Sequence, residues 1–326
     1  MESQRLVIPQ ENVCRLERFE LPNQPQGSRI RIESIASVIS AGTEIANYTG
    51  REPRTRIPGS WCAYPWVPGY GNIGRIQAVG PDAPKSLHPG RVVFSFGPHA
   101  AHFERDGAPG RDVIVPLPDD IDAKKAVFAR MASVAATSLW HCEPYLRVDD
   151  TVAVVGLGLV GNLAAQLLQM AGAQVLGFDI TPRRREVAQA SGIKSVYDPG
   201  EALGDAIKAA TGGRGARFVI EATGITNLVP GALAGTANNG FCILLGSPRQ
   251  PLTANGVDHL SDIHLRGLHL MGALEWVYPL HAGRDGRGID TRLAWLVELI
   301  GTGRLAVEPM WTHTLAPSEA PEAYHG

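Results

Sequence analysis

The chain reads TVAVVGLGLVG from Thr151 to Gly161, and this stretch decides the fold. Its first five residues are almost uniformly apolar, as expected of a parallel strand that is buried on both faces of a sheet. Gly156, Gly158 and Gly161 then follow with Gly-x-Gly-x-x-Gly spacing, and apolar residues recur at helical spacing as far as Ala171. Strand, glycine-rich turn and helix in this order predict a βαβ unit whose turn binds the pyrophosphate of a dinucleotide.

Each glycine of this turn has its own physical reason. Gly156 permits the tight turn, Gly158 lets the backbone approach the pyrophosphate, and Gly161 lets the helix pack close to the strand. Leu159 and Val160 begin the helix, where unpaired backbone N–H groups favour an anion. The pattern alone is a weak signal, because glycine-rich turns are common, but the flanking strand and helix make it specific.

Asp179 follows the next expected strand, residues 174–178, and indicates which dinucleotide binds. Its carboxylate can accept both ribose hydroxyls of the adenosine half, whereas a 2′-phosphate would meet like charge. NAD(H) is therefore favoured over NADP(H). Arg183, Arg184 and Arg185 suit a phosphate, or else form a solvated helix face, and we place Arg184 at the cofactor site.

Length and composition describe an ordinary globular enzyme. The 326 residues predict two domains, and the formal charge of -2 gives no reason to expect nucleic acid or a membrane as a partner. The sequence has no long apolar run and no secretion signal, so we expect a cytoplasmic protein. The four cysteines lie far apart, which argues against a disulfide framework and a thiolate metal cage.

The pattern of elements predicts an α/β protein with two kinds of sheet. Short strands between glycines and prolines in residues 1–146 indicate an irregular β-barrel, with a helix from about residue 120 to 142. Strands alternating with helices in residues 147–275 indicate a doubly wound parallel sheet. Residues 276–326 form a tail that is expected to return to the first domain.

Several motifs resemble the medium-chain dehydrogenase/reductase superfamily, zinc-type alcohol dehydrogenase-like, over nearly the whole chain. They are Ser40–Glu44 with Tyr48–Gly50, Val67–Gly71, and Glu221–Gly224. The resemblance implies a GroES-like catalytic domain followed by a Rossmann domain. The stretches SAGTE, PGY, GPHA and LLGSPR are most similar to the branch that includes bacteriochlorophyllide hydroxyethyl dehydrogenase, although a chlorophyllide substrate does not follow from this.

The residues that bind catalytic zinc in this superfamily are replaced here. Ala41 stands at the cysteine position, Tyr70 at the histidine position, and Gly71 in place of the adjacent glutamate. The helix that often carries the third ligand reads FARMAS over residues 128–133, without Cys, Asp or Glu. Tetrahedral zinc needs about three protein donors, so we expect no zinc.

The structural zinc lobe is also replaced, by FGPHAAHF over residues 96–103. His99 and His102 are a pair that is more typical of surface or packed histidines than of a metal site. We therefore predict that no metal binds.

Without zinc, hydride transfer still requires a donor to the substrate oxygen. The resemblance implies that Thr43 contacts this oxygen, and Tyr70 carries a phenol in place of a zinc ligand. Tyr48 is a second phenol, and Glu44 either holds the loop or relays a proton. We predict that Tyr70 and Thr43 together replace the metal. The alternatives are that Tyr70 only fills the space of the metal and that Thr43 and Glu44 only stabilise a turn.

The resemblance also implies which residues line the nicotinamide. These are Thr137, Thr223, Gly224, Gly246 and Ser247. His141 lies one helical turn after Thr137 and is either catalytic or a packed histidine.

The function predicted is zinc-independent, NAD(H)-dependent interconversion of an alcohol and a carbonyl on a small molecule. Trp61, Tyr64 and Trp66 favour a ring-bearing sugar or natural-product intermediate, or else pack an irregular loop. One alternative is an NAD(P)H-dependent enone or quinone reductase, and another is a catalytically inert dinucleotide-binding protein. The apolar strand 268–272 predicts a homodimer. The last residues, 323–326, stand where the superfamily adds a helix and a strand, so we expect a trimmed or different tail.

Overall fold

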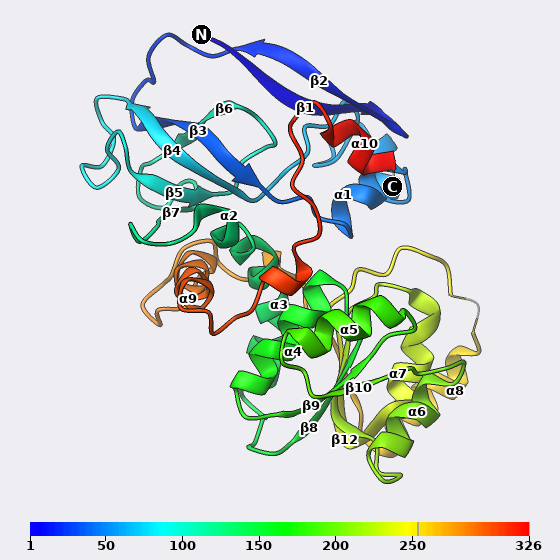
Figure 1. Ribbon diagram of the computed structural model, residues 1–326. Helices are drawn as coiled ribbons and strands as arrows, with labels where there is room; N and C mark the ends of the chain where they lie inside the picture. The colour runs from blue at the N-terminus through cyan, green and yellow to red at the C-terminus, as the bar shows by residue number, and fades with distance from the viewer. Residues whose placement is uncertain (253, 326) are drawn as a thin grey trace. The chain divides into compact units, whose positions relative to one another are not determined.

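The computed structural model describes residues 1–252 and 254–325, and it divides into two compact units (Figure 1). The first unit contains residues 1–130, 278–304 and the segment from Thr312 onward. The second unit contains residues 131–277 and 305–311. Within the described residues, no helix combines the length and the apolar character that a membrane span needs.

The second unit is built on a six-stranded parallel sheet with the order β10-β9-β8-β11-β12-β13. The strand order reverses between β8 and β11, which is where ligands bind in doubly wound sheets. The strands are β8 (Thr151–Val155), β9 (Gln174–Phe178), β10 (Ser195–Tyr197), β11 (Ala216–Glu221), β12 (Thr236–Leu244) and β13 (His269–Gly272).

Helices cover both faces of this sheet (Figure 1). One face carries α4 (Leu159–Met170) and α5 (Pro182–Ala190), and the other carries α6 (Leu203–Ala210), α7 (Val229–Gly235) and α8 (Gly256–Arg266). The core between the sheet and α6 and α7 is apolar, because parallel strands are buried on both sides. The unit also contains α3 (Ala129–Cys142, from Met131 on), η2 (Thr226–Leu228), η3 (Glu275–Val277) and η4 (Glu308–Met310).

The first unit is built on a five-stranded antiparallel sheet with the order β6-β3-β4-β5-β7. Its core includes the buried side chains of Ile30, Ile32, Ile76, Val93 and Phe103. The strands are β3 (Arg29–Ser37), β4 (Asn72–Val79), β5 (Val92–Ser95), β6 (His102–Asp106) and β7 (Ile114–Pro116). The helices are α1 (Thr43–Tyr48), η1 (Pro53–Arg56), α2 (Ala123–Ala126), α9 (Ile289–Gly301) and α10 (Ala320–His325).

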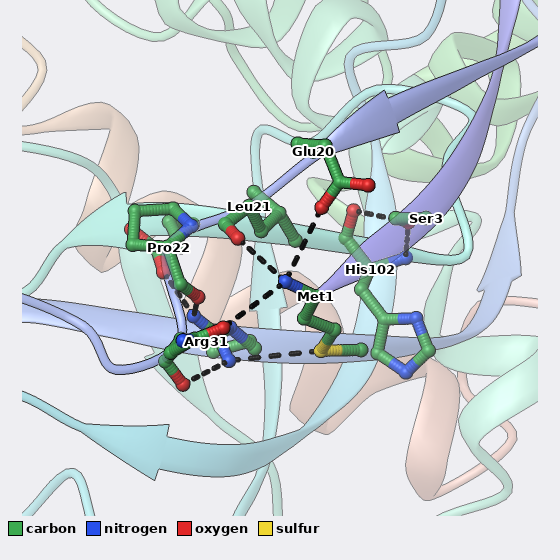
Figure 2. A network of polar contacts seen from close by, with 9 residues as sticks. Met1, Ser3, Glu20, Leu21, Pro22, Arg31 and His102 are labelled. Carbon is green, nitrogen blue, oxygen red and sulfur yellow. Dashed lines mark hydrogen bonds and ion pairs between the residues drawn. The ribbon is translucent and has the colours of Figure 1, made fainter.

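A separate antiparallel hairpin, β1 (Glu2–Gln10) and β2 (Val13–Glu20), is fastened to this sheet by polar contacts (Figure 2). Ser3 Oγ donates to the carbonyl of His102 at 3.1 Å, and the N–H of His102 donates back to Ser3 Oγ at 3.0 Å. The N-terminal ammonium donates to the carbonyl of Leu21 at 2.8 Å. The two bonds between Ser3 and His102 satisfy backbone groups at the start of β6, so the hairpin extends the irregular all-β unit.

The fold class predicted from the sequence is confirmed: an irregular antiparallel β unit accompanies a doubly wound parallel sheet. The helix expected over residues 120–142 is interrupted and becomes α2 and α3. Asp122 caps α2, because its side chain accepts from the N–H of Lys124 at 2.9 Å. The two units separate at Arg130 and Met131, earlier than the expected boundary at residue 146, so most of α3 belongs to the parallel-sheet unit.

Candidate active site

The glycine turn after β8 fits a dinucleotide, and each glycine is required for a different reason. Gly156 has φ +87°, and a Cβ there would lie 2.5 Å from Thr223 Cγ2. A Cβ on Gly161 would lie 1.8 Å from the carbonyl oxygen of Gly156. A Cβ on Gly158 would meet no heavy atom within 4 Å, so open space lies beside this backbone. Gly156 and Gly161 therefore permit the packing of the turn, and Gly158 leaves room for a ligand at the start of α4, where Leu159 and Val160 lie.

The carboxylate of Asp179 is buried and holds this turn. Its Oδ2 accepts from the N–H of Leu157 at 2.8 Å, and its Oδ1 accepts from the N–H of Thr181 at 2.8 Å. Arg184 Nη1 lies 3.7 Å from Oδ2, with its side chain largely exposed. Arg185 donates to the Asp179 carbonyl at 2.7 Å and therefore contributes to the fold of this loop. Asp179 and Arg184 are thus neighbours at the position expected to meet the adenosine ribose.

Glu221, which sequence reasoning did not assign to the site, holds the turn that follows β11. Its carboxylate accepts from the N–H groups of Thr223 at 2.8 Å and Gly224 at 3.1 Å. Burial raises the pKa of Glu221, and the hydrogen bonds from Thr223 and Gly224 partly oppose this rise. A Cβ on Gly246 would lie 2.1 Å from the N–H nitrogen of Gly224, and one on Gly224 would lie 2.8 Å from the Ser247 carbonyl oxygen. The turns after β8, β11 and β12 are therefore packed against one another.

The two polar residues that the sequence suggests near the nicotinamide on α3 differ in exposure: Thr137 is buried and His141 is partly exposed. Thr137 is fully buried, and its Oγ1 donates to the carbonyl of Ser133 at 3.4 Å. Burial lowers the pKa of His141, which favours its neutral form.

The sequence did contain a signal for Glu221, because this residue is an acidic side chain at the end of the strand sequence ARFVIE.

In the first unit, three hydroxyl-bearing residues meet near the start of α1, and we call Ser40, Thr43 and Tyr70 the hydroxyl cluster. Tyr70 donates its hydroxyl to Ser40 Oγ at 3.0 Å. The backbone N–H of Thr43 donates to the same oxygen at 3.3 Å. Two of the predicted catalytic residues, Thr43 and Tyr70, therefore lie together. Ser40 was missed, although it directly precedes the Ala41 that replaces a zinc ligand.

Glu44 is fully buried and has a holding role. Its Oε1 accepts from the N–H of Ser40 at 3.1 Å, and its Oε2 lies 2.9 Å from His99 Nε2. Tyr324 of α10 donates its hydroxyl to the same Oε2. Burial and the charge of Glu44 raise the pKa of Tyr324 well above its ordinary value. Glu44 therefore connects the loop of the hydroxyl cluster to α10 and to His99, which was considered as a metal ligand.

Tyr48 lies apart from the hydroxyl cluster. Its ring is buried against Leu6 and Ile8, and its hydroxyl donates to the carbonyl of Asn12 at 2.8 Å. The same hydroxyl lies 2.7 Å from His325 Nδ1. The structure therefore places the Tyr48 side chain in a packed cluster with the C-terminal helix, where its hydroxyl contacts Asn12 and His325.

The residues at the expected zinc position do not fit zinc. Tyr70 is committed to Ser40, and the guanidinium carbon of Arg130 lies 4.2 Å from the centroid of the Tyr70 ring. Ala41 carries no donor atom, and a buried guanidinium opposes a second cation at the same place. Over residues 1–252 and 254–325, no three His, Cys, Asp or Glu side chains gather closely enough to hold a metal ion.

The aromatic segment between η1 and β4 contains an exposed tryptophan. Trp61 is 54% exposed, and its ring meets that of Trp66 edge-on at 6.2 Å between centroids. The guanidinium carbon of Arg54 lies 5.8 Å from the Trp61 ring centroid. Two neighbours therefore hold a large aromatic surface in contact with solvent.

Comparison with known proteins agrees with this architecture. Residues 160–277 match the family model described as zinc-binding dehydrogenase. A 2-desacetyl-2-hydroxyethyl bacteriochlorophyllide A dehydrogenase of Cereibacter sphaeroides is 29% identical over 93% of this chain and 87% of its own. A D-guloside 3-dehydrogenase of Shigella flexneri is 36% identical over 38% of this chain and 35% of its own.

Solved structures show the same fold. The crystal structure of galactitol-1-phosphate dehydrogenase from Escherichia coli has a TM-score of 0.77 at 18% identity, over 94% of this chain and 91% of the other. A zinc-binding dehydrogenase homologue from Sinorhizobium meliloti 1021, solved with NADP bound, has a TM-score of 0.79 at 18% identity, over 100% of this chain and 96% of the other.

The two units thus define a dinucleotide-dependent oxidoreductase architecture. The family-model match and the curated relatives support the medium-chain dehydrogenase/reductase superfamily for this chain, with zinc-type alcohol dehydrogenases among the relatives.

Proposed function

We propose that this protein is a zinc-independent oxidoreductase that uses NAD(H) to interconvert an alcohol and a carbonyl on a small molecule. The observation that carries the proposal is the contact of Tyr70 with Ser40, beside Thr43. It supports the proposal because the resemblance implies that the superfamily uses a metal at the position of Tyr70 to polarise the substrate oxygen, and a hydroxyl donor can take over that role. The glycine turn and Asp179 supply the other requirement, a place for the cofactor.

In the reductive direction, Tyr70 acts as the proton donor. When bound, NADH supplies a hydride to the carbonyl carbon and becomes NAD+. The electron pair of the C=O π bond moves to oxygen, and Tyr70 transfers its hydroxyl proton to that oxygen. Ser40 and Thr43 orient Tyr70, and a proton from water restores its hydroxyl. The oxidation follows the same steps in reverse.

Asp179 supports NAD(H) over NADP(H), because a 2′-phosphate would approach a buried carboxylate. Arg184, 3.7 Å from that carboxylate, supports some tolerance for the phosphate. The exposed ring of Trp61 supports a substrate with a ring, on whose flat face an indole can stack.

The decisive variant is Tyr70→Phe, which removes the hydroxyl and keeps the ring. We expect kcat for NADH-dependent reduction to fall about 100-fold, the scale of general acid catalysis. The dissociation constant of NADH, measured by fluorescence, should stay within about twofold, because the residues that we assign to the cofactor are untouched. The matched control is Tyr145→Phe, a half-exposed tyrosine stacked on Phe241 in the second unit.

The substrate screen would cover cyclic ketones, ketosugars, quinones and enones, with EDTA present and absent. Full turnover by Tyr70→Phe, or activity lost in EDTA and restored by zinc, would contradict the proposal. Turnover of enones alone would instead support an enone reductase. Binding of NADH without turnover of any compound would support a catalytically inert dinucleotide-binding protein.

We also propose a homodimer, formed through the edge strand β13. Leu270 on this strand is 44% exposed, and the adjacent α8 exposes Val257, Leu260 and Leu265. An apolar sheet edge of this kind favours pairing with a second copy of the strand.

A further inference from the structure

We propose that Arg130 is a positioning residue whose buried guanidinium fixes the ring of Tyr70 and supplies the positive charge that zinc supplies in related enzymes. This inference rests on the function proposed above and deepens it. It concerns a residue at the start of α3 that the sequence marked only as the wrong type for a metal ligand.

Burying the Arg130 side chain carries a free-energy cost. Its side chain is 1% exposed, and a buried cation is costly unless its surroundings compensate. It also lies in the first turn of a helix, where the helix dipole disfavours a positive charge. A cation kept at such a place needs a compensating interaction.

Two aromatic rings contribute to that compensation. The guanidinium carbon lies 4.2 Å from the centroid of Tyr70 and 4.9 Å from that of Phe96. Both distances are well within the range of cation–π attraction, which is strongest when the cation is desolvated. The guanidinium therefore limits the tilt of the Tyr70 ring and, with it, the direction of the hydroxyl.

Gly71 shows that the space is fitted to Arg130. A Cβ at Gly71 would lie 2.6 Å from Arg130 Cβ and 2.7 Å from its Cγ. The position next to Tyr70 therefore accepts no side chain while Arg130 is in place. The replacements at residues 70, 71 and 130 form one arrangement in space, in which a fixed cation stands beside a phenol.

The arrangement has a direct chemical consequence. Electron density that gathers on the Tyr70 phenol during proton transfer is stabilised by the positive charge that lies over its ring, 4.2 Å from the ring centroid in a buried setting. Because the hydroxyl of Tyr70 also bonds to Ser40 at 3.0 Å, ring and hydroxyl are both held before substrate arrives. Arg130 acts through Tyr70, so its loss should lower kcat and leave the binding of NADH unchanged.

The test is a set of variants assayed with NADH and the carbonyl of the substrate screen that has the highest kcat/KM. We expect Arg130→Met to lower kcat about 30-fold with less than a threefold change in KM, the sign of an interaction made in the transition state. Arg130→Lys keeps the charge but loses the planar stack, and should lower kcat only about threefold. Arg5→Met is the matched control, because the Arg5 guanidinium carbon lies 4.8 Å from the Phe19 ring centroid in the distant hairpin.

A double-mutant cycle separates this role from a structural one. If Arg130 acts through Tyr70, the double variant Tyr70→Phe/Arg130→Met should have the kcat of Tyr70→Phe within about twofold. A purely structural role would instead give multiplied losses. Multiplied losses, or an Arg130→Met enzyme as active as Arg5→Met, would overturn the inference.

The two proposals can fail separately. Full activity of Tyr70→Phe would remove the proposed function, whereas loss in Tyr70→Phe with full activity in Arg130→Met would remove only the role of Arg130. If the wild-type protein turns over no compound, urea unfolding tests the contact between Arg130 and the Tyr70 ring instead. The proteins compared are Tyr70→Leu, Arg130→Met and their double variant. A coupling of about fivefold between the two substitutions in the equilibrium constant of unfolding would support the cation–π contact, and strictly independent effects would overturn it.

Discussion

At the scale of single residues, Asp179 combines an expected role in cofactor binding with an observed role in holding the glycine turn. The same carboxylate that is expected to meet the ribose accepts a hydrogen bond from Leu157 inside the glycine turn. Its neighbour Arg184 lies close enough to reduce its negative field, at 3.7 Å. We therefore propose that this pair of opposite charges sets the choice between the two dinucleotides, and each member of the pair can be removed by itself.

We predict that Asp179→Ala weakens NADH binding about tenfold or more, because both the ribose acceptor and the support of the turn are lost. Affinity for NADPH should fall less, since the like-charge repulsion disappears together with the support. Fluorescence titration with both cofactors measures the ratio. Asp198→Ala is the control, because this half-exposed aspartate pairs with Arg185 at 2.9 Å.

A preference for NADH that is the same in Asp179→Ala and in wild type would show that Asp179 does not discriminate between the cofactors. Arg184→Ala provides the converse measurement. It should weaken NADPH binding and leave NADH binding nearly unchanged.

Residue identity alone selected two residues that lie together in the structure. Thr43 and Tyr70 were selected because they stand at positions that matter in the superfamily, and they do share a partner in Ser40. Tyr48 was selected as a second phenol and Glu44 as a residue that holds the loop or relays a proton, but their hydrogen bonds connect them to α10, nearly 280 residues later in the chain. Contacts at that separation leave no local pattern in a sequence.

At the scale of elements, the burial of a strand determines how well its position can be predicted from the sequence. Strands β8 and β9 were predicted at their observed bounds, because strands covered on both faces form short apolar runs with clear ends. The β1–β2 hairpin was missed, since its strands are partly exposed and mix charged with apolar residues. Helix α1 was also missed, because six residues are too few to establish a helical period.

The turn between β8 and α4 allows two alanine substitutions with different outcomes. Gly161→Ala should destabilise the second unit, because its Cβ would overlap the Gly156 carbonyl at 1.8 Å, and we expect a loss of about 2 kcal/mol or more. Gly158→Ala should leave the free energy of unfolding within about 1 kcal/mol, because its Cβ meets open space.

Gly158→Ala, the more stable of the two variants, should be the one with impaired NADH binding. Gly158→Ala is expected to bind NADH at least about tenfold more weakly, since its methyl group occupies the space for the pyrophosphate. Urea unfolding and fluorescence titration of both proteins test this. A stable Gly161→Ala protein, or a Gly158→Ala protein with normal affinity, would contradict the assignment of the turn.

At the scale of the whole molecule, two units share one chain that passes between them repeatedly. The sequence predicted the change from an antiparallel to a parallel sheet, because strand composition and the spacing of turns change with it. It did not place α3 in the second unit, since helix periodicity shows which face is buried but not against which unit. The glycine turns belong to the second unit and the hydroxyl cluster to the first.

The edge of the parallel sheet provides the last prediction. β13 pairs with β12 on one side only, and it exposes Leu270 on a strand with few charges. Light scattering at micromolar concentration should therefore give twice the 34.8 kDa of one chain. Leu270→Lys places a charge at the paired edge and should give the mass of one chain, whereas Val148→Lys, at an exposed position before β8, should not. A monomeric wild-type protein would contradict the dimer, and a Leu270→Lys protein of unchanged mass would show that the copies meet on another surface.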